Sequence, residues 1–279
     1  MKGKKMIFPE TFKIEKISVP HLVTIPYSHY CELGRWALDI SKTEYKEMKY
    51  MPGYHVSIVG GLRKRKENRS NSSFVGQESS HHGGRRKYSV PLVAMPDGTI
   101  LKDSWEILEK FVGPVDPYWK DLLDNKLGIA VRQLVYFYFL NPKNKGLLDN
   151  ILKQTSLAER IYWLFFGGIV KKSMYELMDI TEESIEKSKK NIFEVFEEAS
   201  EKLASNSNSL TTESSFSPTD LAFCALGSIA IFPQNYSRNV ISLGNLEDFP
   251  KEYQNIINHC RKTPAGKFII DIYDSKRII

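Results

Sequence analysis

The stretch that decides the fold runs from Ile25 to Leu38 and reads IPYSHYCELGRWAL. An apolar strand, Leu22–Ile25, leads into it and a helical pattern of apolar residues follows, so a strand, a short turn and a helix are expected here. Ser28 stands where the helix begins. Backbone N–H groups at a helix start lack partners, and the helix dipole adds about half a positive charge, so an anion would be stabilised in front of Ser28. Taken alone, a Ser before a helix is more often an ordinary N-cap.

A second segment, Ser89–Leu108, predicts a β-hairpin followed by a helix. The residues Pro96–Gly98 favour a turn between two short β-type runs. Pro91 opens the first run, where a proline suits an edge, a strand start or a cis bend. The pair Asp103–Ser104 then begins the helix, and a helix cap accounts for this pair as well as a binding role does.

A third segment, Phe216–Leu226, contains the start of a buried helix. Ser217 is placed as the N-cap, Pro218 at the first helical position and Asp220 at the third, which is a start resembling a capping box. The helix that follows is apolar nearly all round, so we expect it to be structural and buried.

In their order and spacing, the three segments resemble the glutathione transferase superfamily. Members of that family have a thioredoxin-like domain with Ser, Tyr or Cys at the start of the first helix, a cis-proline in a Val-Pro pair, and an acidic-Ser pair opening the third helix. An all-helical domain with a Ser-x-x-Asp capping motif follows. The resemblance extends over roughly residues 20–272 and implies an α/β thioredoxin-like domain followed by an all-α helical bundle domain.

The resemblance also implies a glutathione site. Ser28 would be the catalytic hydroxyl, as in Ser-type, theta- or zeta-like members, with Tyr27, Tyr30 and Cys31 as alternatives for contacting the thiol. The expected glutathione-binding residues are Val90 and Pro91 beside its cysteine, and Asp103 and Ser104 at its γ-glutamyl end. Lys87 is expected near its glycyl carboxylate, with Arg85 and Arg86 as alternatives.

The function implied is a glutathione transferase, in which glutathione is a co-substrate activated as a thiolate that attacks a hydrophobic electrophile. Isomerase, dehalogenase and ether-cleaving reactions use the same thiolate and remain open, as does the precise electrophile. The alternative is a non-catalytic binding or protein-interaction module of the same fold. The resemblance further implies detoxification as the role and a homodimer as the assembly.

Composition fits two soluble domains. The chain has 279 residues, of which 42% are hydrophobic, and no apolar run reaches the roughly 18 residues that a membrane span needs. Three cysteines without framework spacing predict reduced thiols in the cytoplasm, and no metal site is expected. We expect an N-terminal extension at 1–20, the thioredoxin-like domain at 21–113 and the helical domain at 118–279, separated by the stiff segment Gly113–Pro117.

A basic insertion at about 60–88 carries a net charge of +6, which equals the formal net charge of the whole chain. Its Ser, Asn, Gly and His content predicts a surface loop. The run Arg63–Lys66 is more typical of a solvated charge run than of a contact with nucleic acid or an acidic partner. Outside the insertion, a strand is expected at Tyr45–Met51, and helices are expected at about 120–140, 147–178, 181–205, 217–232 and 250–261.

Overall fold

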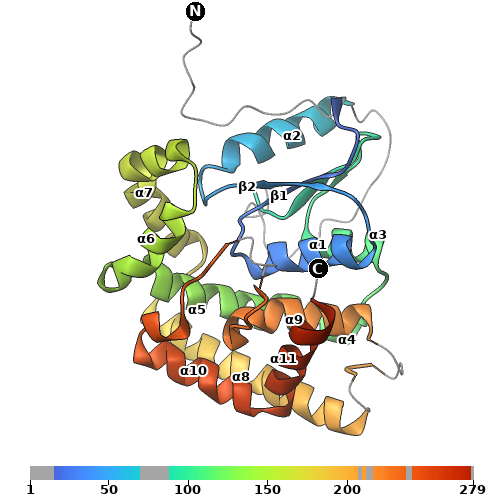
Figure 1. Ribbon diagram of the computed structural model, residues 1–279, viewed down its shortest axis with the longest axis vertical. Helices are drawn as coiled ribbons and strands as arrows, with labels where there is room; N and C mark the ends of the chain where they lie inside the picture. The colour runs from blue at the N-terminus through green and yellow to red at the C-terminus, as the bar shows by residue number, and fades with distance from the viewer. Residues whose placement is uncertain (1–15, 70–87, 207–208, 212–215, 237–240, 278–279) are drawn as a thin grey trace, which may run out of the picture.

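The computed structural model describes residues 16–69, 88–206, 209–211, 216–236 and 241–277 (Figure 1). A small sheet with flanking helices comes first along the chain and occupies the upper part of Figure 1. From residue 117 onward the regular elements of the described residues are all helices, and most of them form the lower part of Figure 1.

The sheet has four short strands, which are β1 (His21–Thr24), β2 (Lys46–Lys49), β3 (Leu92–Ala94) and β4 (Ile100–Leu101). Their order is β2-β1-β3-β4, with β2 parallel to β1 and β3 antiparallel to both β1 and β4. The predicted hairpin is confirmed, because the Met95 N–H donates to the Thr99 carbonyl at 2.8 Å across the turn. Gly98 has a φ of +89° there, a conformation that glycine adopts without steric cost.

Three helices cover the sheet, namely α1 (His29–Ile40), α2 (Val56–Arg69) and α3 (Ser104–Phe111). Figure 1 shows α2 on one face and α1 and α3 on the other. Adjacent residues of β1 serve the two faces, as expected for a strand: Val23 packs in the cluster that contains Ile58 of α2, whereas Leu22 packs in the cluster that contains Trp36 of α1. The sheet is therefore buried on both sides.

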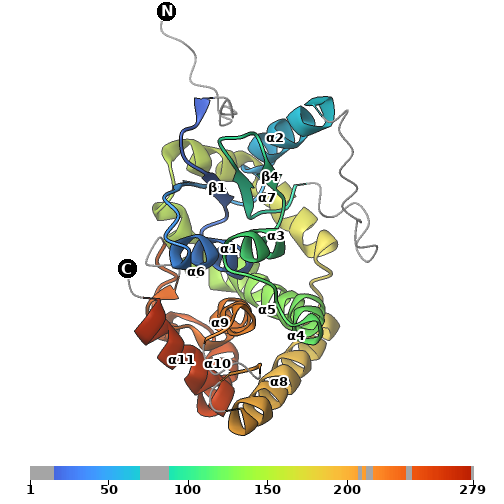
Figure 2. The same cartoon turned by 90° about the vertical axis from the view of Figure 1, so that its right-hand side faces the viewer.

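The helical part begins with α4 (Pro117–Leu122), a π-helical turn (Leu123–Leu127) and α5 (Gly128–Leu140). It continues with α6 (Lys145–Lys153), α7 (Leu157–Leu177), α8 (Glu182–Ser205), α9 (Pro218–Ile231), α10 (Lys251–Lys262) and α11 (Pro264–Lys276). Short 3₁₀ turns at Pro142–Asn144 and Leu246–Asp248 precede α6 and α10. Figure 2 shows α1 and α3 beside each other, with α9 on the side of α1 away from the sheet.

Helix α9 is buried from Thr219 to Ile231, as its sequence predicted. The Ser217 hydroxyl accepts from the Asp220 N–H at 3.2 Å, while the Asp220 carboxylate accepts from the Ser217 N–H at 2.8 Å. The same carboxylate accepts from the Leu210 N–H at 2.8 Å, so Asp220 also fixes the segment before the helix. The capping prediction is confirmed.

Three expectations about secondary structure were wrong. The first ten residues of the predicted basic loop are helical, because α2 continues to Arg69. The helix expected at 147–178 is two helices, and a capping box between Ser156 and Glu159 begins the second. The final helix, α11, was not expected, although Thr263 caps it and Pro264 is its first residue. The rest of the predicted loop, 70–87, lies outside the described residues.

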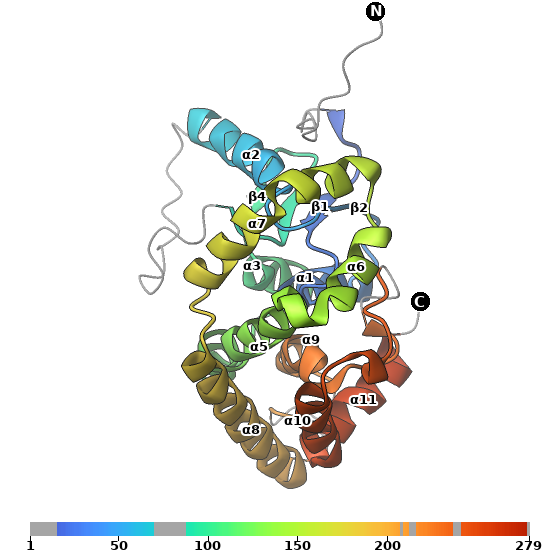
Figure 3. The ribbon, with the colours of Figure 1, turned by 90° about the vertical axis from the view of Figure 1, so that its left-hand side faces the viewer.

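Helix α7 stands apart from the other long helices and runs beside the sheet domain (Figure 3). Its buried Glu159 accepts from the Met51 N–H at 2.8 Å, in the connection between β2 and α2. The rings of Tyr162 and Tyr54 meet edge to face with centroids 5.4 Å apart. In the described part of the chain, no helix combines the length and apolar character needed to cross a membrane.

Candidate functional site

Ser28 lies in the turn between β1 and α1 and is the N-cap of α1. Its φ and ψ of −81° and 128° are extended, and its hydroxyl oxygen accepts from the Cys31 N–H at 3.5 Å. The Ser28 N–H donates to the Ile25 carbonyl at 3.0 Å, which closes the turn. Ser28 is half-buried, so its hydroxyl stands at the positive end of the helix dipole while keeping some exposure.

The three alternatives to Ser28 are engaged elsewhere. Tyr27 is buried, and its ring stacks on Phe139 with centroids 6.1 Å apart and an interplanar angle of 2°. The Tyr30 hydroxyl donates to the Asp124 carbonyl at 3.4 Å. Burial raises the pKa of the Cys31 thiol to about 12, outweighing hydrogen bonds from the Ile25 N–H and Ser28. A thiol with that pKa is not a nucleophile at neutral pH.

The Val90–Pro91 peptide bond is cis, as the resemblance implied. This pair lies against α1, because a Cβ added at Gly34 would stand 3.1 Å from Pro91 Cγ and 3.3 Å from Ile107 Cδ1 of α3. Gly34 therefore lets α1, the Val90–Pro91 bend and α3 pack closely. The first two of the three sequence segments therefore meet around this glycine.

Asp103 and Ser104 have clear structural roles at the start of α3. One oxygen of the Asp103 carboxylate accepts from the Trp105 and Glu106 N–H groups, both at 2.9 Å. Ser104 is the first helical residue and is 2% exposed. The capping interpretation of Asp103 is confirmed, while binding by this pair stays a prediction. Lys87 lies outside the described residues.

Comparison with known proteins gives similarity in structure. No protein-family model matches the chain, and no curated protein matches it in sequence. A crystal structure of a glutathione S-transferase of Ceriporiopsis subvermispora, in complex with glutathione, superposes with a TM-score of 0.52. The superposition covers 94% of this chain and 99% of that one, at 12% sequence identity. This chain has the glutathione transferase fold.

Two further solved structures are similar at lower scores. The β-etherase LigF from Sphingobium sp. strain SYK-6 gives a TM-score of 0.47, 14% identity, and coverage of 91% of this chain and 99% of that one. Ure2p in complex with glutathione gives 0.44, 12% identity, and coverage of 90% and 94%. The predicted fold class, an α/β thioredoxin-like domain followed by an all-helical domain, is confirmed.

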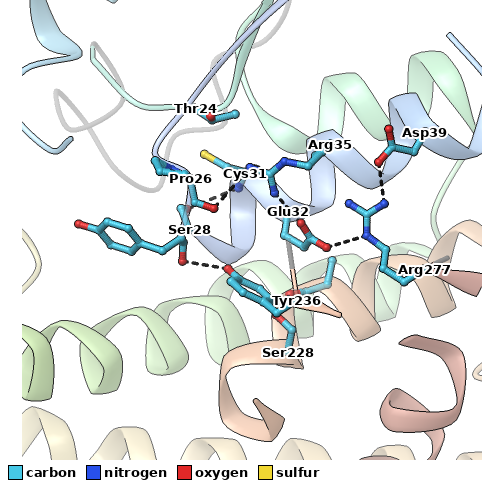
Figure 4. A network of polar contacts seen from close by, with 12 residues as sticks. Thr24, Pro26, Ser28, Cys31, Glu32, Arg35, Asp39, Ser228, Tyr236 and Arg277 are labelled. Carbon is cyan, nitrogen blue, oxygen red and sulfur yellow. Dashed lines mark hydrogen bonds and ion pairs between the residues drawn. The ribbon is translucent and has the colours of Figure 1, made fainter. Parts of the chain in front are cut away.

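In this fold, a buried ionic network joins α1 and β2 to Arg277 at the end of α11 (Figure 4). Glu32 of α1 is completely buried and pairs with Arg35 at 2.5 Å and with Arg277 at 2.8 Å. Arg35 also pairs with Glu47 of β2 at 2.7 Å, and Arg277 with Asp39 at 2.6 Å. Burial opposes the charge on Glu32, but Arg277 and Arg35 outweigh it and hold the pKa of Glu32 below its ordinary value.

The same network reaches the Ser28 turn from two sides. The Tyr236 hydroxyl donates to the Tyr27 carbonyl at 2.9 Å, and Tyr236 is buried in the connection after α9 (Figure 4). Arg35 donates to the Pro26 carbonyl at 3.4 Å. These carbonyls belong to the two residues before Ser28. The helical domain and α1 therefore together hold the backbone that carries the hydroxyl. No local pattern in the sequence points to Tyr236, because it lies 209 residues from Tyr27.

Two ionisable residues of this chain, His29 and Arg132, lie beside the turn. Burial lowers the pKa of His29 to about 3, so it is neutral, and its Nε2 lies 2.9 Å from the Gly128 carbonyl oxygen. The Arg132 guanidinium of α5 lies over the Tyr30 ring at 5.8 Å. Its Nε is buried without a hydrogen-bond partner among the described residues. Arg132 thus brings a positive charge to the side of the turn that faces the helical domain.

Two cavities lie in the helical part. One, of about 440 Å³, opens between α4 and the end of α8, with Trp119, Glu198 and Lys202 in its wall. The other, of about 240 Å³, lies among α5, α6 and α7, with Phe139 and Trp163 in its wall. Neither wall includes a residue that the sequence predicted for the site.

Proposed function

We propose that this protein binds glutathione at the Ser28 turn and activates its thiol for attack on a hydrophobic electrophile. The observation that carries the proposal is the half-buried Ser28 hydroxyl at the N-terminus of α1, where a developing anion meets a hydrogen-bond donor and a helix dipole. The similar Ceriporiopsis protein was crystallised with glutathione, which supports this choice of ligand.

The chemistry needs a thiolate. A free thiol has a pKa of about 8.5 and is mostly protonated at neutral pH. A hydroxyl that donates to the sulfur stabilises the anion and lowers that pKa, as does the positive end of α1. The sulfur lone pair then forms the new bond to the electrophilic carbon, and the leaving group departs with its bonding electrons. Ser28 holds the hydrogen bond to sulfur, and Tyr236 and Arg35 hold the turn.

The remaining contacts in the proposal follow the resemblance. Val90 would pair through its backbone with the cysteine of glutathione, while Asp103 and Ser104 would hold the γ-glutamyl end. Only one carboxylate oxygen of Asp103, Oδ1, accepts the hydrogen bonds of the helix cap, so Oδ2 takes no part in the cap. We further propose that the protein is cytoplasmic, consistent with three cysteines that are all free and buried.

The deciding experiment compares Ser28→Ala with Ser41→Ala, a matched control at the other end of α1. Ser41 donates to the Leu38 carbonyl at 2.8 Å and lies away from the turn. We expect Ser28→Ala to lower glutathione-dependent turnover of an aryl halide by about 10- to 1000-fold. Ser41→Ala should retain the wild-type rate. Melting temperatures of both variants should stay close to that of the wild type.

Calorimetric titration with glutathione separates the possible failures. If the wild type binds no glutathione, the proposed function is wrong. If it binds glutathione and Ser28→Ala keeps full turnover, Ser28 is not the hydroxyl, and Tyr27→Phe and Tyr30→Phe become the variants to measure.

A non-catalytic protein-interaction module of the same fold is the second candidate, and the burial of Ser104 favours it. A side chain that is 2% exposed offers little surface to the γ-glutamyl end of glutathione. This candidate predicts no glutathione binding by calorimetry and no turnover of any electrophile above the uncatalysed rate.

A further inference from the structure

A series of contacts connects helix α7 to the chain just before the bend at Val90 and Pro91. It begins at Glu159 in the first turn of α7, passes through the connection between β2 and α2, and ends at Tyr88. Figure 3 shows α7 beside α2, the helix that follows this connection. The series therefore leads from the helical domain to the part of the thioredoxin-like domain where glutathione is proposed to bind.

The first contact joins the two domains through the main chain of Met51. Glu159 is 6% exposed, and its Oε1 accepts from the Met51 N–H at 2.8 Å. Its Oε2 accepts from the N–H and the hydroxyl of Ser156, at 3.1 and 2.7 Å. One carboxylate oxygen thus closes the capping box of α7, and the other holds Met51. Because Met51 is fully buried, bulk water does not replace Glu159 as the acceptor.

His55 lies on the carbonyl side of Met51. The Met51 carbonyl accepts from the Tyr54 and His55 N–H groups at 3.1 and 3.3 Å, which closes a turn before α2. The His55 ring lies beside the same carbonyl, with Nδ1 3.4 Å from its oxygen. Its Nε2 lies 3.0 Å from the Tyr88 carbonyl oxygen. The His55 side chain therefore connects the turn to the chain that leads to Val90.

The protonation state of His55 decides which of its two contacts is a hydrogen bond. Burial lowers the pKa of His55 below its ordinary value of 6.5, so the ring is neutral at neutral pH and carries one N–H. Both ring nitrogens face carbonyl oxygens, and the distance to the Tyr88 oxygen is the shorter one. We assign the proton to Nε2 on these distances, so that Nε2 donates to the Tyr88 carbonyl.

Tyr88 is held at two points, one at the start of α2 and one within it. Its carbonyl accepts from His55, and its ring lies on Gly60, since a Cβ added at Gly60 would stand 3.2 Å from Tyr88 Cε1. Val90 follows two residues later, and its cis bond to Pro91 leads into strand β3. The backbone of Val90 is therefore held by β3 on one side and by Tyr88 on the other.

We propose that Glu159 and His55 are positioning residues for glutathione, which act on it through the Val90 backbone. This role rests on the proposed function at Ser28. Glu159 holds the Met51 turn, which carries His55. His55 in turn holds the chain that presents the Val90 backbone. Because Val90 would pair with the cysteine of glutathione equally in the ground state and the transition state, loss of either residue should weaken glutathione binding without lowering kcat.

The first test uses the difference between the two ring nitrogens of His55. A glutamine amide places an N–H near the position of Nε2, whereas an asparagine amide reaches only the position of Nδ1. His55→Gln should keep the contact with Tyr88 and bind glutathione as the wild type does. His55→Asn should raise the glutathione dissociation constant and KM by about 3- to 10-fold, with kcat unchanged. His259→Asn, at an exposed histidine of α10, is the control and should match the wild type.

The second test separates the Met51 contact from the capping box of α7. Glu159→Ala removes both contacts of the carboxylate, whereas Ser156→Ala removes the capping hydroxyl and leaves the Met51 contact. Both variants should lower Tm, because both lose the cap. Only Glu159→Ala should raise the glutathione dissociation constant, again by about 3- to 10-fold. Equal binding by the two variants would show that Met51 needs no acceptor from α7.

A double variant tests whether the two residues act along one route. Glu159→Ala combined with His55→Asn should raise the dissociation constant no more than the larger single change, because both break the same connection. Effects that multiply would contradict a connected series.

Calorimetric titration with glutathione distinguishes the two levels of failure. If the wild type binds no glutathione, the proposed function fails and the positioning role fails with it. If the wild type binds glutathione, and His55→Asn and Glu159→Ala bind it equally well, only the positioning role is wrong. A fall in kcat at unchanged KM would also overturn that role. If circular dichroism shows that His55→Asn is unfolded, Glu159→Ala and its Ser156→Ala control decide the outcome.

Discussion

Helix α1 belongs to the thioredoxin-like domain and α7 packs against that domain, but the two helices differ in which of their side chains are buried. Nearly all of α1 is buried, and its charged residues Glu32 and Arg35 find partners inside the protein. Helix α7 buries one face and leaves a stripe of leucine, isoleucine and phenylalanine exposed. Removing the charged groups of α1 from water is costly, and ion pairs within the same chain offset that cost. In α7 the unfavourable feature is the exposure of apolar side chains to water, and the described part of the chain does not cover them.

The two helices therefore differ in what their side chains contribute to stability. Contacts of α1 contribute to the free energy of unfolding, since their partners belong to the same chain. The exposed apolar side chains of α7 contribute little to that free energy, because they remain in contact with water in the folded chain. Four measurements test this difference.

The largest effect is expected for Glu32→Ala. Removing this carboxylate leaves Arg35 and Arg277 buried without their shared partner, and breaking a buried pair costs about 3 to 5 kcal/mol of unfolding free energy. Glu109→Ala is the control, because Glu109 pairs with Lys120 at 2.5 Å in solvent. That exposed pair should contribute less than about 1 kcal/mol. Urea unfolding of both variants measures the difference, and equal losses would refute a special role for the buried network.

The second measurement follows the network with pH. The folded-state pKa of Glu32 lies below its ordinary value of 4.5, so its stabilisation is present above that value and is lost as pH falls through the folded-state pKa. The stability difference between the wild type and Glu32→Gln should therefore be constant at neutral pH and shrink below about pH 4.5. Urea unfolding across this range measures it. A difference that grows on acidification would show that Glu32 is protonated in the folded protein.

The third measurement concerns the hydroxyl that holds the turn. Tyr236→Phe leaves the buried Tyr27 carbonyl without its donor, which should cost about 1 to 3 kcal/mol of unfolding free energy. Tyr118→Phe removes a hydroxyl bonded to Glu198 in solvent and should change stability by less than about 0.5 kcal/mol. If glutathione turnover is found, Tyr236→Phe should lower kcat more than it raises KM, because it loosens the turn that carries Ser28. If the kinetics of Tyr236→Phe equal those of the wild type, Tyr236 contributes to stability and not to turnover.

The smallest effect is expected on the exposed face of α7. Leu164→Glu should melt within a few degrees of the wild type, because the side chain is 79% exposed and loses few contacts. Thermal melts followed by circular dichroism measure the shift. A loss of stability as large as that of Glu32→Ala would show that contacts within the chain hold Leu164.

Local signals in the sequence were sufficient for much of the fold. Capping at Ser28, Asp103 and Ser217, and the turn at Pro96–Gly98, involve residues within a few positions of one another. Each can be predicted because its donor and acceptor are neighbours along the chain. The resemblance depended on the order of such local features, which explains why it identified the fold without any matching family model.

The wrong predictions have physical reasons. Arg, Lys and Glu favour helix as well as solvent, so the charged residues up to Arg69 could extend α2 although they suggested a loop. The break before Ser156 was overlooked, although Ser and Glu three residues apart are a signal of a helix start. The Glu32–Arg277 contact could not be predicted, because nothing local links residues that are 245 positions apart. The burial of Ser104 likewise depends on packing between helices rather than on its neighbours in the sequence.

The contact between Glu32 and Arg277 also has a consequence for how the chain is made. At translation rates of about 5 to 20 residues per second, the guanidinium is synthesised roughly 12 to 50 seconds after the carboxylate that it will meet. During that interval the newly made α1 has neither Arg277 nor the apolar surface of α9 against it. A nascent thioredoxin-like domain would therefore leave the ribosome with an unfinished face, and we expect it to depend on chaperones until the last helices arrive.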